Sequence, residues 1–301
     1  MEFERVFYKN DFAAGAAWLN LYMICKLNPT LHISPSAFEL TSVLVGGTNW
    51  GNLGYPGEYG RSTGSTNTLT RLGIYTSYDY GAAITENRQV YREKYSELKL
   101  EANFLKVSPA YLTASVEPTV NGTYASNDAI TVTPLFGNGT VTNFYIVRHA
   151  DFQQKMSATY TLNLNTSQGT LSIPQLGGTL TLSGRDSKWH VTDYDLGGTT
   201  LLYSTAEIFT WKTFDSASVL VVYGGPGELH ELAVITKSSA SMVEGTGVTS
   251  KSSRGSTILN WQTSPTRRVV QVGNLFVYIL DRNSAYNYWV PDFVRDDEWG
   301  A

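Results

Sequence analysis

The residues best suited to chemistry lie between Gly46 and Ile84, in the segment GGTNWGNLGYPGEYGRSTGSTNTLTRLGIYTSYDYGAAI. Its two ends are rich in aromatic rings and in polar groups that bind hydroxyls, namely Asn49, Trp50, Asn52, Tyr55, Tyr78, Asp79 and Tyr80. Amides and carboxylates hydrogen-bond to sugar hydroxyls, while aromatic rings stack on apolar C–H faces. The residue types alone allow two interpretations: an aromatic-rich loop that merely packs on the end of a barrel, or a carbohydrate-binding loop.

The composition of the whole chain argues against several functional classes. Charged residues make up 16% of 301 residues and the net charge is −4, so we expect no nucleic-acid partner. Cys25 is the only cysteine, which excludes an internal disulfide and a cysteine-based zinc site. No stretch reaches the roughly 18 apolar residues of a membrane helix. We expect a globular protein with no cofactor, no metal site and no membrane partner.

Three glycosylation triplets of the form Asn-X-Ser/Thr begin at Asn121, Asn138 and Asn165, each among turn-forming residues. Three triplets on predicted β-turns are typical of a protein that passes through the secretory route. The first residues, MEFERVFYKND, lack the apolar region of a signal peptide. We therefore expect an extracellular protein whose natural beginning lies upstream of this chain.

Two helices and one strand are predicted around the aromatic segment. Apolar residues from Phe3 to Leu19 recur at helical spacing, with a break expected near Asn10. The stretch from Arg88 to Lys106 has a stronger helical period among its charges. Between them, LNLYMI is short and apolar, which indicates a buried strand.

From about Ser108 the pattern changes to that of β-strands. Residues 158–164 alternate between apolar and polar side chains, the period of a half-buried strand. Further strand-like runs are GTLSI, GTLTLSG, SVLVVYGG, LAVIT, RRVVQV and NLFVYIL. Short turns separate them, which is typical of an antiparallel sandwich or barrel. We interpret the charges of SGRDSK as local salt bridges and GGPGELHE as a polar hairpin.

Nine segments carry a resemblance to a known family: EFERVFYKND, LNLYMI, GGTNWGNLGYPG, YTSYDYGAAI, REKYSELKL, IPQLGGTLTLSGRDSK, HVTDYDLGGT, STAEIFTWK and DRNSAYNYWVP. Together they resemble the fungal β-galactosidases of glycoside hydrolase family 35. The resemblance implies a TIM-barrel catalytic domain followed by β domains, and a retaining cleavage of terminal β-linked galactose in galactose-containing oligosaccharides or polysaccharides. It also implies that Tyr22 and Tyr80 line the galactose pocket, with Asn49, Trp50, Tyr78 and Asp79 in neighbouring site loops.

The chain departs from that family at the reacting groups. A retaining glycosidase needs two carboxyl groups about 5 Å apart. In the family both are glutamates on barrel strands that precede EFERVFYKND, and neither motif is present here. We therefore expect a fragment of a longer enzyme that is inactive alone. The alternatives are a β-sandwich module that binds carbohydrate without chemistry, and a pseudogene or mis-spliced product.

Two stretches, residues 25–45 and 58–73, interrupt the family's motifs. Their codons can accommodate intron boundaries, and removing them restores YMIFGGTNWG and YPGIYTSYDYG. Retained introns and genuine surface loops both remain as interpretations, because long surface loops are tolerated.

The predicted architecture is mainly β. Residues 1–106 form an incomplete (β/α)8-barrel remnant, residues 107–291 an antiparallel β-sandwich or β-rich second domain, and residues 292–301 a divergent tail. We expect residues 1–106 to be poorly packed, because a single strand–helix remnant cannot close a barrel.

Overall fold

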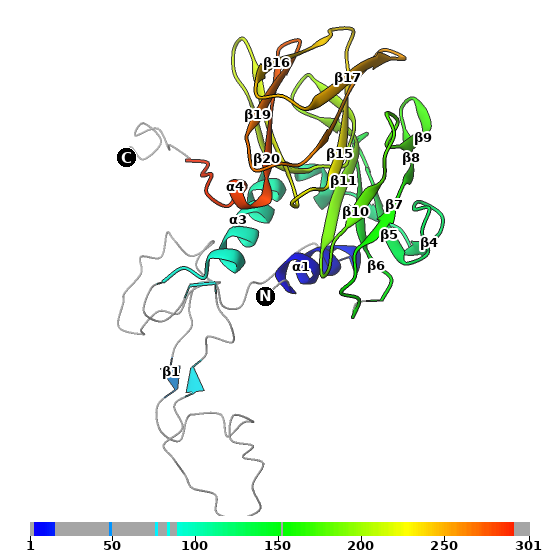
Figure 1. Cartoon of the computed structure of the whole chain (residues 1–301). Helices are drawn as coiled ribbons and strands as arrows, with labels where there is room; N and C mark the ends of the chain where they lie inside the picture. Colours follow the sequence, from blue (N-terminus) through cyan, green and yellow to red (C-terminus); the bar gives the residue numbers. More distant parts are fainter. Residues whose placement is uncertain are drawn as a thin grey trace, which may run out of the picture. The chain divides into compact units, whose positions relative to one another are not determined.

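The computed structural model describes residues 3–15, 48–49, 76–77, 83–84, 89–151 and 153–291. The chain divides into two compact units, one formed by Met1–Ala17 with Glu97–Ala301 and the other by Trp18–Ser96. In the second unit, the short strands β1 (Thr48–Asn49) and β2 (Thr76–Ser77) pair antiparallel. The first unit is mainly β (Figure 1).

The helices are α1 (Phe3–Ala13), α3 (Arg92–Lys106), the 3-10 helix η3 (Pro109–Leu112) and α4 (Arg282–Ala285). The remaining strands are β3 (Ser115–Val116), β4 (Val120–Asn121), β5 (Ile130–Phe136), β6 (Asn143–His149), β7 (Ala158–Tyr160), β8 (Leu162–Thr166), β9 (Gly169–Ile173), β10 (Leu180–Leu182), β11 (Ser187–Asp195), β12 (Thr200–Ser204), β13 (Glu207–Thr213), β14 (Ser218–Gly224), β15 (Leu229–Ile235), β16 (Ala240–Glu244), β17 (Val248–Ser253), β18 (Ser256–Gln262), β19 (Arg268–Val272) and β20 (Leu275–Asp281). Among the described residues, none of the helices combines the length and the apolar character needed to cross a membrane.

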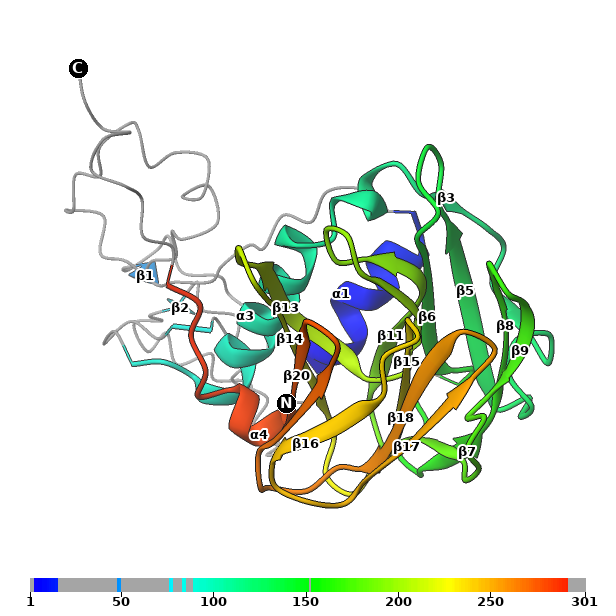
Figure 2. The same ribbon diagram turned by 90° about the horizontal axis from the view of Figure 1, so that it is seen from above.

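The strands form two large sheets and two hairpins. A nine-stranded sheet has the order β17-β18-β15-β12-β11-β6-β5-β3, with β4 also paired to β5. A five-stranded sheet has the order β13-β14-β20-β19-β16, and the hairpins are β7 with β10 and β8 with β9 (Figures 1 and 2). The predicted antiparallel pairing is confirmed except between β14 and β20, which run parallel.

One face of the nine-stranded sheet is covered by the two hairpins. The alternation predicted for residues 158–164 is present, with Tyr160, Leu162 and Leu164 buried. The chain nevertheless changes partner at Thr161, since β7 pairs with β10 and β8 with β9. The hairpin side chains pack with buried residues of β5, β6, β12, β15 and β18 into one core, including Ile130, Val132, Tyr145, Val147, Leu202, Tyr203, Ala233 and Ile258.

Helices cover the opposite face near β6 and β11. Trp189 of β11 lies 5.6 Å from Phe12 of α1 and 5.3 Å from Phe104 of α3, measured between ring centroids. Phe144 of β6 lies 5.9 Å from the same indole. Helix α1 runs without a break through Asn10, and Phe12 is buried, so the expectations of a break and of poor packing are wrong for this helix.

The five-stranded sheet packs on α3 and α4. Its core contains Leu100 of α3, Phe209 of β13, Tyr223 of β14 and Leu280 of β20, together with Tyr286 just after α4.

Strand β11 of the nine-stranded sheet lies between the hairpins on one face and the helices on the other, and residues 187–194 are all buried. A strand buried on both faces has no solvent-facing side for its polar residues, so each polar side chain in it needs an internal partner.

Candidate functional site

The sequence-predicted sugar-binding residues fall mostly outside the described residues. This applies to Tyr22, Trp50, Tyr78, Asp79 and Tyr80. Asn49 is described as part of β1, where it pairs with Thr76 of β2. That pairing joins the backbones of the GGTNWG and YTSYDYG segments, although residues 58–73 lie between them in the sequence.

The three glycosylation triplets are all at the surface of the β-rich unit. Asn121 ends β4, Asn138 lies in the loop between β5 and β6, and Asn165 lies in β8, and each residue is exposed. The Asn165 side chain accepts a hydrogen bond from the hydroxyl of Thr170 across the hairpin, at 2.7 Å.

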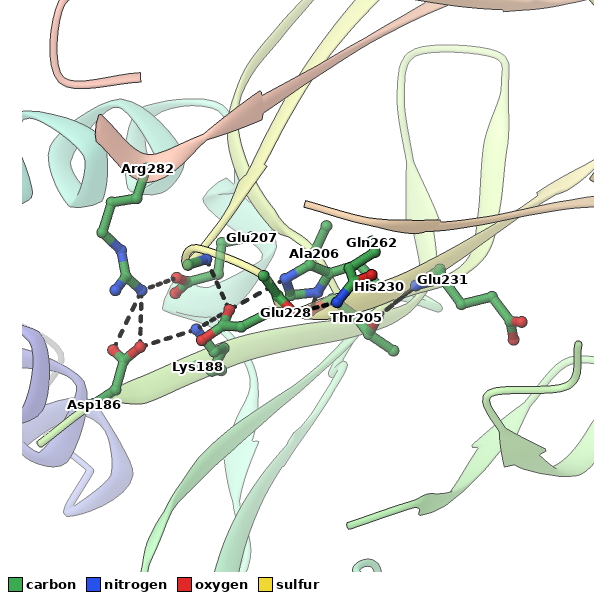
Figure 3. Close-up of polar contacts among 12 residues, drawn as sticks. Asp186, Lys188, Thr205, Ala206, Glu207, Glu228, His230, Glu231, Gln262 and Arg282 are labelled. Atoms are coloured by element: carbon green, nitrogen blue, oxygen red, sulfur yellow. Dashed lines mark hydrogen bonds and ion pairs between the residues drawn. The ribbon is translucent and has the colours of Figure 1, made fainter. Parts of the chain in front are cut away.

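Charged side chains from several separate elements meet in the interior of this unit (Figure 3). We call this group the buried charge cluster; it comprises Lys9, Glu97, Asp186, Lys188, Glu207, Glu228 and Arg282. Its members come from α1, α3, the start of β11, the start of β13, the turn before β15, and α4. All seven residues are buried, so the ion pairs between them replace contacts with water.

Arg282 and Lys188 hold the centre of the cluster together. The Arg282 Nη2 atom lies 3.0 Å from Asp186 Oδ2 and 3.3 Å from Glu207 Oε2, and its Nε lies 3.3 Å from Glu97 Oε1. Lys188 Nζ lies 2.9 Å from Asp186 Oδ2 and 2.8 Å from Glu228 Oε2. Asp186 thus bridges the two cations (Figure 3).

Lys9 brings α1 into the same cluster. Its ammonium group donates to the Ser187 carbonyl oxygen at 2.9 Å and pairs with the Glu207 carboxylate. Glu207 also accepts from the Trp189 backbone N–H at 3.3 Å. A residue of the N-terminal helix is therefore tied to the first residues of β11 and β13.

The interpretation of GGPGELHE as a polar hairpin is wrong, because β14 and β15 belong to different sheets and His230 and Glu231 are buried. The turn between these strands is shaped to fit the side chains of Glu228 and His230. His230 Nε2 lies 3.3 Å from Glu228 Oε2, and His230 Nδ1 lies 3.1 Å from the Thr205 carbonyl oxygen. A Cβ on Gly224 would come within 2.1 Å of His230, and one on Gly225 within 2.5 Å of Glu228. The paired glycines of GGPGE are thus needed for close packing as well as for a turn.

The cations lower the pKa of Asp186 and of Glu228 in the cluster. Burial alone would raise the pKa of Asp186, but Arg282 and Lys188 together hold it below its ordinary value. Burial likewise raises the pKa of Glu228, but Lys188 lowers it by a larger amount, so the net change is a fall. The same carboxylates outweigh the effect of burial on the Lys188 ammonium and raise its pKa.

Glu101, on α3 at the edge of the cluster, behaves in the opposite way. Its carboxylate accepts from Trp189 Nε1 at 2.8 Å. Burial raises the pKa of Glu101 to about 7, and repulsion from Glu207 and Glu97 adds to this, while Lys9 and the Trp189 bond oppose it. The carboxyl group is therefore largely protonated in mildly acidic solution.

This geometry suits a structural role. The cavity next to Asp186 has a volume of only about 50 Å³. The cavity cannot hold a pyranose ring, and the cluster's carboxylates are bound to internal cations. Among the described residues, the cluster thus fixes elements to one another.

Sequence reasoning identified only part of this cluster. The predicted salt bridge within SGRDSK is confirmed between Asp186 and Lys188, but Glu207, Arg282 and Lys9 were not connected with it. A usable signal existed, because charges stand inside apolar strand runs in SKWHV and AEIF. What the sequence could not supply is the long-range pairing of segments from both ends of the chain.

We predict that Lys188→Met strongly destabilises the protein, because Glu228 and Asp186 lose a shared cation in the interior. Breaking a buried ion pair from one side costs about 3–5 kcal/mol of unfolding free energy. Arg267→Met is the matched control, since Arg267 pairs with Glu244 at 2.7 Å but both side chains are more than two-fifths exposed. Urea unfolding of the two variants measures the difference, and equal midpoints would contradict the prediction.

We predict that Glu101 makes the protein less stable as the pH rises. Its folded-state pKa of about 7 lies above the ordinary value of 4.5, so its contribution is complete below pH 4.5 and is lost as the pH rises through 7. Between these limits the unfolding free energy should fall by about 3 kcal/mol relative to Glu101→Gln. Glu93→Gln, an exposed position on the same helix, should follow the wild type. Parallel wild-type and Glu101→Gln curves would refute this assignment.

Comparison with known proteins bears on both halves of the chain. Residues 113–288 match the family described as "Beta-galactosidase, domain 2", and residues 38–105 match "Glycosyl hydrolases family 35". Beta-galactosidase A of Aspergillus niger is 52% identical over 297 residues, which cover 98% of this chain and 26% of that protein. Beta-galactosidase A of a Penicillium species is 54% identical over 293 residues, covering 96% of this chain and 25% of that protein.

The chain spans about a quarter of the length of these relatives. The resemblance carried by the nine sequence segments is confirmed, since the matched family region extends over most of the β-rich part of the chain. The chain therefore belongs to the family of beta-galactosidase domain 2, and it carries ahead of that domain a stretch similar to the glycosyl hydrolases of family 35.

Proposed function

We propose that this chain is part of a β-galactosidase that removes terminal non-reducing β-D-galactose from oligosaccharides or polysaccharides by a retaining mechanism. The observation that carries the proposal is the identity of 52% to a protein named beta-galactosidase A across 98% of the chain. In such a mechanism one carboxyl group acts as acid and base, and a second forms a covalent glycosyl intermediate. Neither of these glutamates is supplied by the present 301 residues.

Within that enzyme, residues 1–106 form the end of the catalytic barrel and carry one wall of the galactose pocket. Tyr22 and Tyr80 contact the galactose, with Asn49, Trp50, Tyr78 and Asp79 in the adjoining loops. The pairing of Asn49 with Thr76 supports this arrangement, because it joins two residues of one loop segment to two of the other through the backbone. Residues 107–291 form the β-rich domain that follows.

The β-rich domain acts as a scaffold in this proposal. Its buried charge cluster is a set of charges already paired with one another, and the cluster includes Lys9 of the N-terminal helix. The domain therefore holds helix α1 against its own strands. This role needs no cofactor and no metal.

The enzyme acts outside the cell in this proposal. The three glycosylation triplets support this, because Asn121, Asn138 and Asn165 are all exposed and thus open to an oligosaccharyltransferase. Galactose-containing polysaccharides are also substrates that a cell meets in its surroundings.

We predict that the 301-residue chain alone does not hydrolyse a chromogenic β-galactoside, because it lacks the pair of reacting carboxyl groups. A chimera in which the chain, without residues 25–45 and 58–73, replaces the matching segment of the Aspergillus niger relative should be active. Steady-state assays on both proteins provide the measurement. Turnover by the isolated chain, or a folded but inactive chimera, would contradict the proposal.

We predict further that Tyr80→Phe in this chimera lowers kcat/KM by roughly 10- to 100-fold, because a buried sugar hydroxyl loses its partner. Tyr286→Phe is the control, since its hydroxyl binds Glu97 of the buried charge cluster and its loss should affect stability instead. An unchanged kcat/KM for Tyr80→Phe would remove Tyr80 from the pocket wall.

A further inference from the structure

The loop between β5 and β6 carries a glycosylation triplet beside an open cleft. Gly139 and Thr140, the second and third residues of the triplet, line a hollow of about 580 Å³ together with Val141, Thr142 and Asp195. This hollow adjoins a second one of about 490 Å³, whose lining includes the same Thr140, Thr142 and Asp195. We call the two together the β5–β6 cleft.

The walls of the cleft have the chemistry of a sugar site. The Trp211 indole lines it and is partly exposed, while its Nε1 already donates to the Val107 carbonyl at 3.0 Å and to the Tyr194 hydroxyl at 3.0 Å. The ring face, rather than the N–H group, is thus what the indole has to offer a ligand. Asp195 is exposed at the cleft and holds the next turn by accepting from Gly197 N at 2.9 Å. An aromatic face next to a carboxylate and threonine hydroxyls suits a pyranose.

Gly197 keeps the indole accessible. It has a φ of +71°, and a Cβ at this position would lie 3.4 Å from the Trp211 ring. A side chain here would therefore cover the ring and strain the backbone. At this side of the cleft Gly197 presents only backbone atoms.

The triplet loop is folded so that its tip stays at the surface. A Cβ on Gly137 would lie 2.4 Å from the Thr140 carbonyl oxygen and 2.6 Å from that of Thr142, so the loop turns back closely on itself. Asn138 follows Gly137 directly and is exposed. The loop thus presents Asn138 for modification while its own next residues form the cleft wall.

The triplet that begins at Asn138 lines the β5–β6 cleft, and the other two triplets do not. Asn121 and Asn165 are also exposed, but no residue of the triplets that begin there lines either hollow of the β5–β6 cleft. A glycan on Asn138 has a sugar-compatible surface within its immediate reach. Its neighbour Val141 is 69% exposed, so a covering glycan would also bury apolar surface.

We propose that an N-linked glycan on Asn138 folds back into the β5–β6 cleft, where its inner sugars stack on Trp211 and hydrogen-bond to Asp195. The occupant is this chain's own glycan, attached at the rim of the site. The proposal rests on the secretory route put forward under the proposed function. Docking links the β5–β6 loop to the β11–β12 turn through the sugar.

The test follows enzymatic release of the glycans from the folded protein. The full chain is secreted from a glycosylating yeast behind a cleavable leader, and endoglycosidase release is timed separately at each site by glycopeptide mass spectrometry. An aromatic stacking contact should slow release at Asn138 by roughly three- to tenfold relative to Asn121 and Asn165. After denaturation the three rates should converge.

A cleft-filling variant separates docking from local crowding. Thr113 is exposed and lines the cleft, so the indole of Thr113→Trp should fill the cleft. Glycan release at Asn138 should then be as fast as at Asn121 and Asn165. Thr249→Trp, at an exposed position of β17 outside the cleft lining, should leave the slow release unchanged. Both variants are checked for a wild-type unfolding midpoint.

Several results would overturn the inference. Equal release rates at the three sites in the wild type would exclude docking, as would slow release that persists unchanged in Thr113→Trp. A bare Asn138 alongside occupied Asn121 and Asn165 would reject this inference alone and leave the secretory route intact. If all three sites were bare, both the secretory route and the inference would fail.

Discussion

A charged side chain that leaves water needs an opposite charge, hydrogen bonds to its charged form, or a change to its neutral form. In the buried charge cluster the first of these brings together segments from near both ends of the described residues. Arg282 reaches Asp186 and Glu207 from near the end of the described residues, while Lys9 reaches Glu207 from near the beginning. An unpaired ion in such surroundings costs several kcal/mol even after relaxation. Separating any of these segments from the others would leave a buried charge unpaired, and the free-energy cost of that stabilises the contacts. This cost adds to any favourable free energy of the ion pair itself.

Several of the segments that carry the family resemblance contribute to this cluster. EFERVFYKND supplies Lys9, REKYSELKL supplies Glu97, and STAEIFTWK supplies Glu207, while SGRDSK and DRNSAYNYW supply the centre of the cluster. Read one at a time, these segments look like solvated turns and helix faces. In the folded unit they meet at one place, and the apolar packing of Trp189 with Phe12 and Phe104 surrounds them on the helical side.

Local periodicity was sufficient to predict most of the β-rich half. The runs GTLSI, SVLVVYGG, RRVVQV and NLFVYIL correspond to β9, β14, β19 and β20, because alternating or continuous apolar character directly reflects which faces are buried. Periodicity failed where the neighbours are distant in sequence. The parallel pairing of β14 with β20 and the change of partner at Thr161 depend on which strand lies alongside, and no local pattern records that.

The candidate sugar site was predicted by residue chemistry and by resemblance, whereas the buried charge cluster needed the structure. Helix α1 illustrates the reason: its apolar spacing predicted a helix, but the sheet on which it packs lies more than a hundred residues away in the sequence. The expectation that residues 1–106 pack poorly considered only barrel neighbours, and for α1 it missed the β-rich domain as a partner.

The most direct test of the buried charge cluster is a double-mutant cycle on Lys9 and Glu207, using Lys9→Met, Glu207→Gln and the double variant in urea unfolding. If the pair joins α1 to the β-rich domain, the two substitutions should be strongly non-additive, with a coupling energy of about 1–3 kcal/mol. Additive effects, with a coupling energy indistinguishable from zero, would show that the helix is held by apolar packing alone and would contradict the central role of the buried charges.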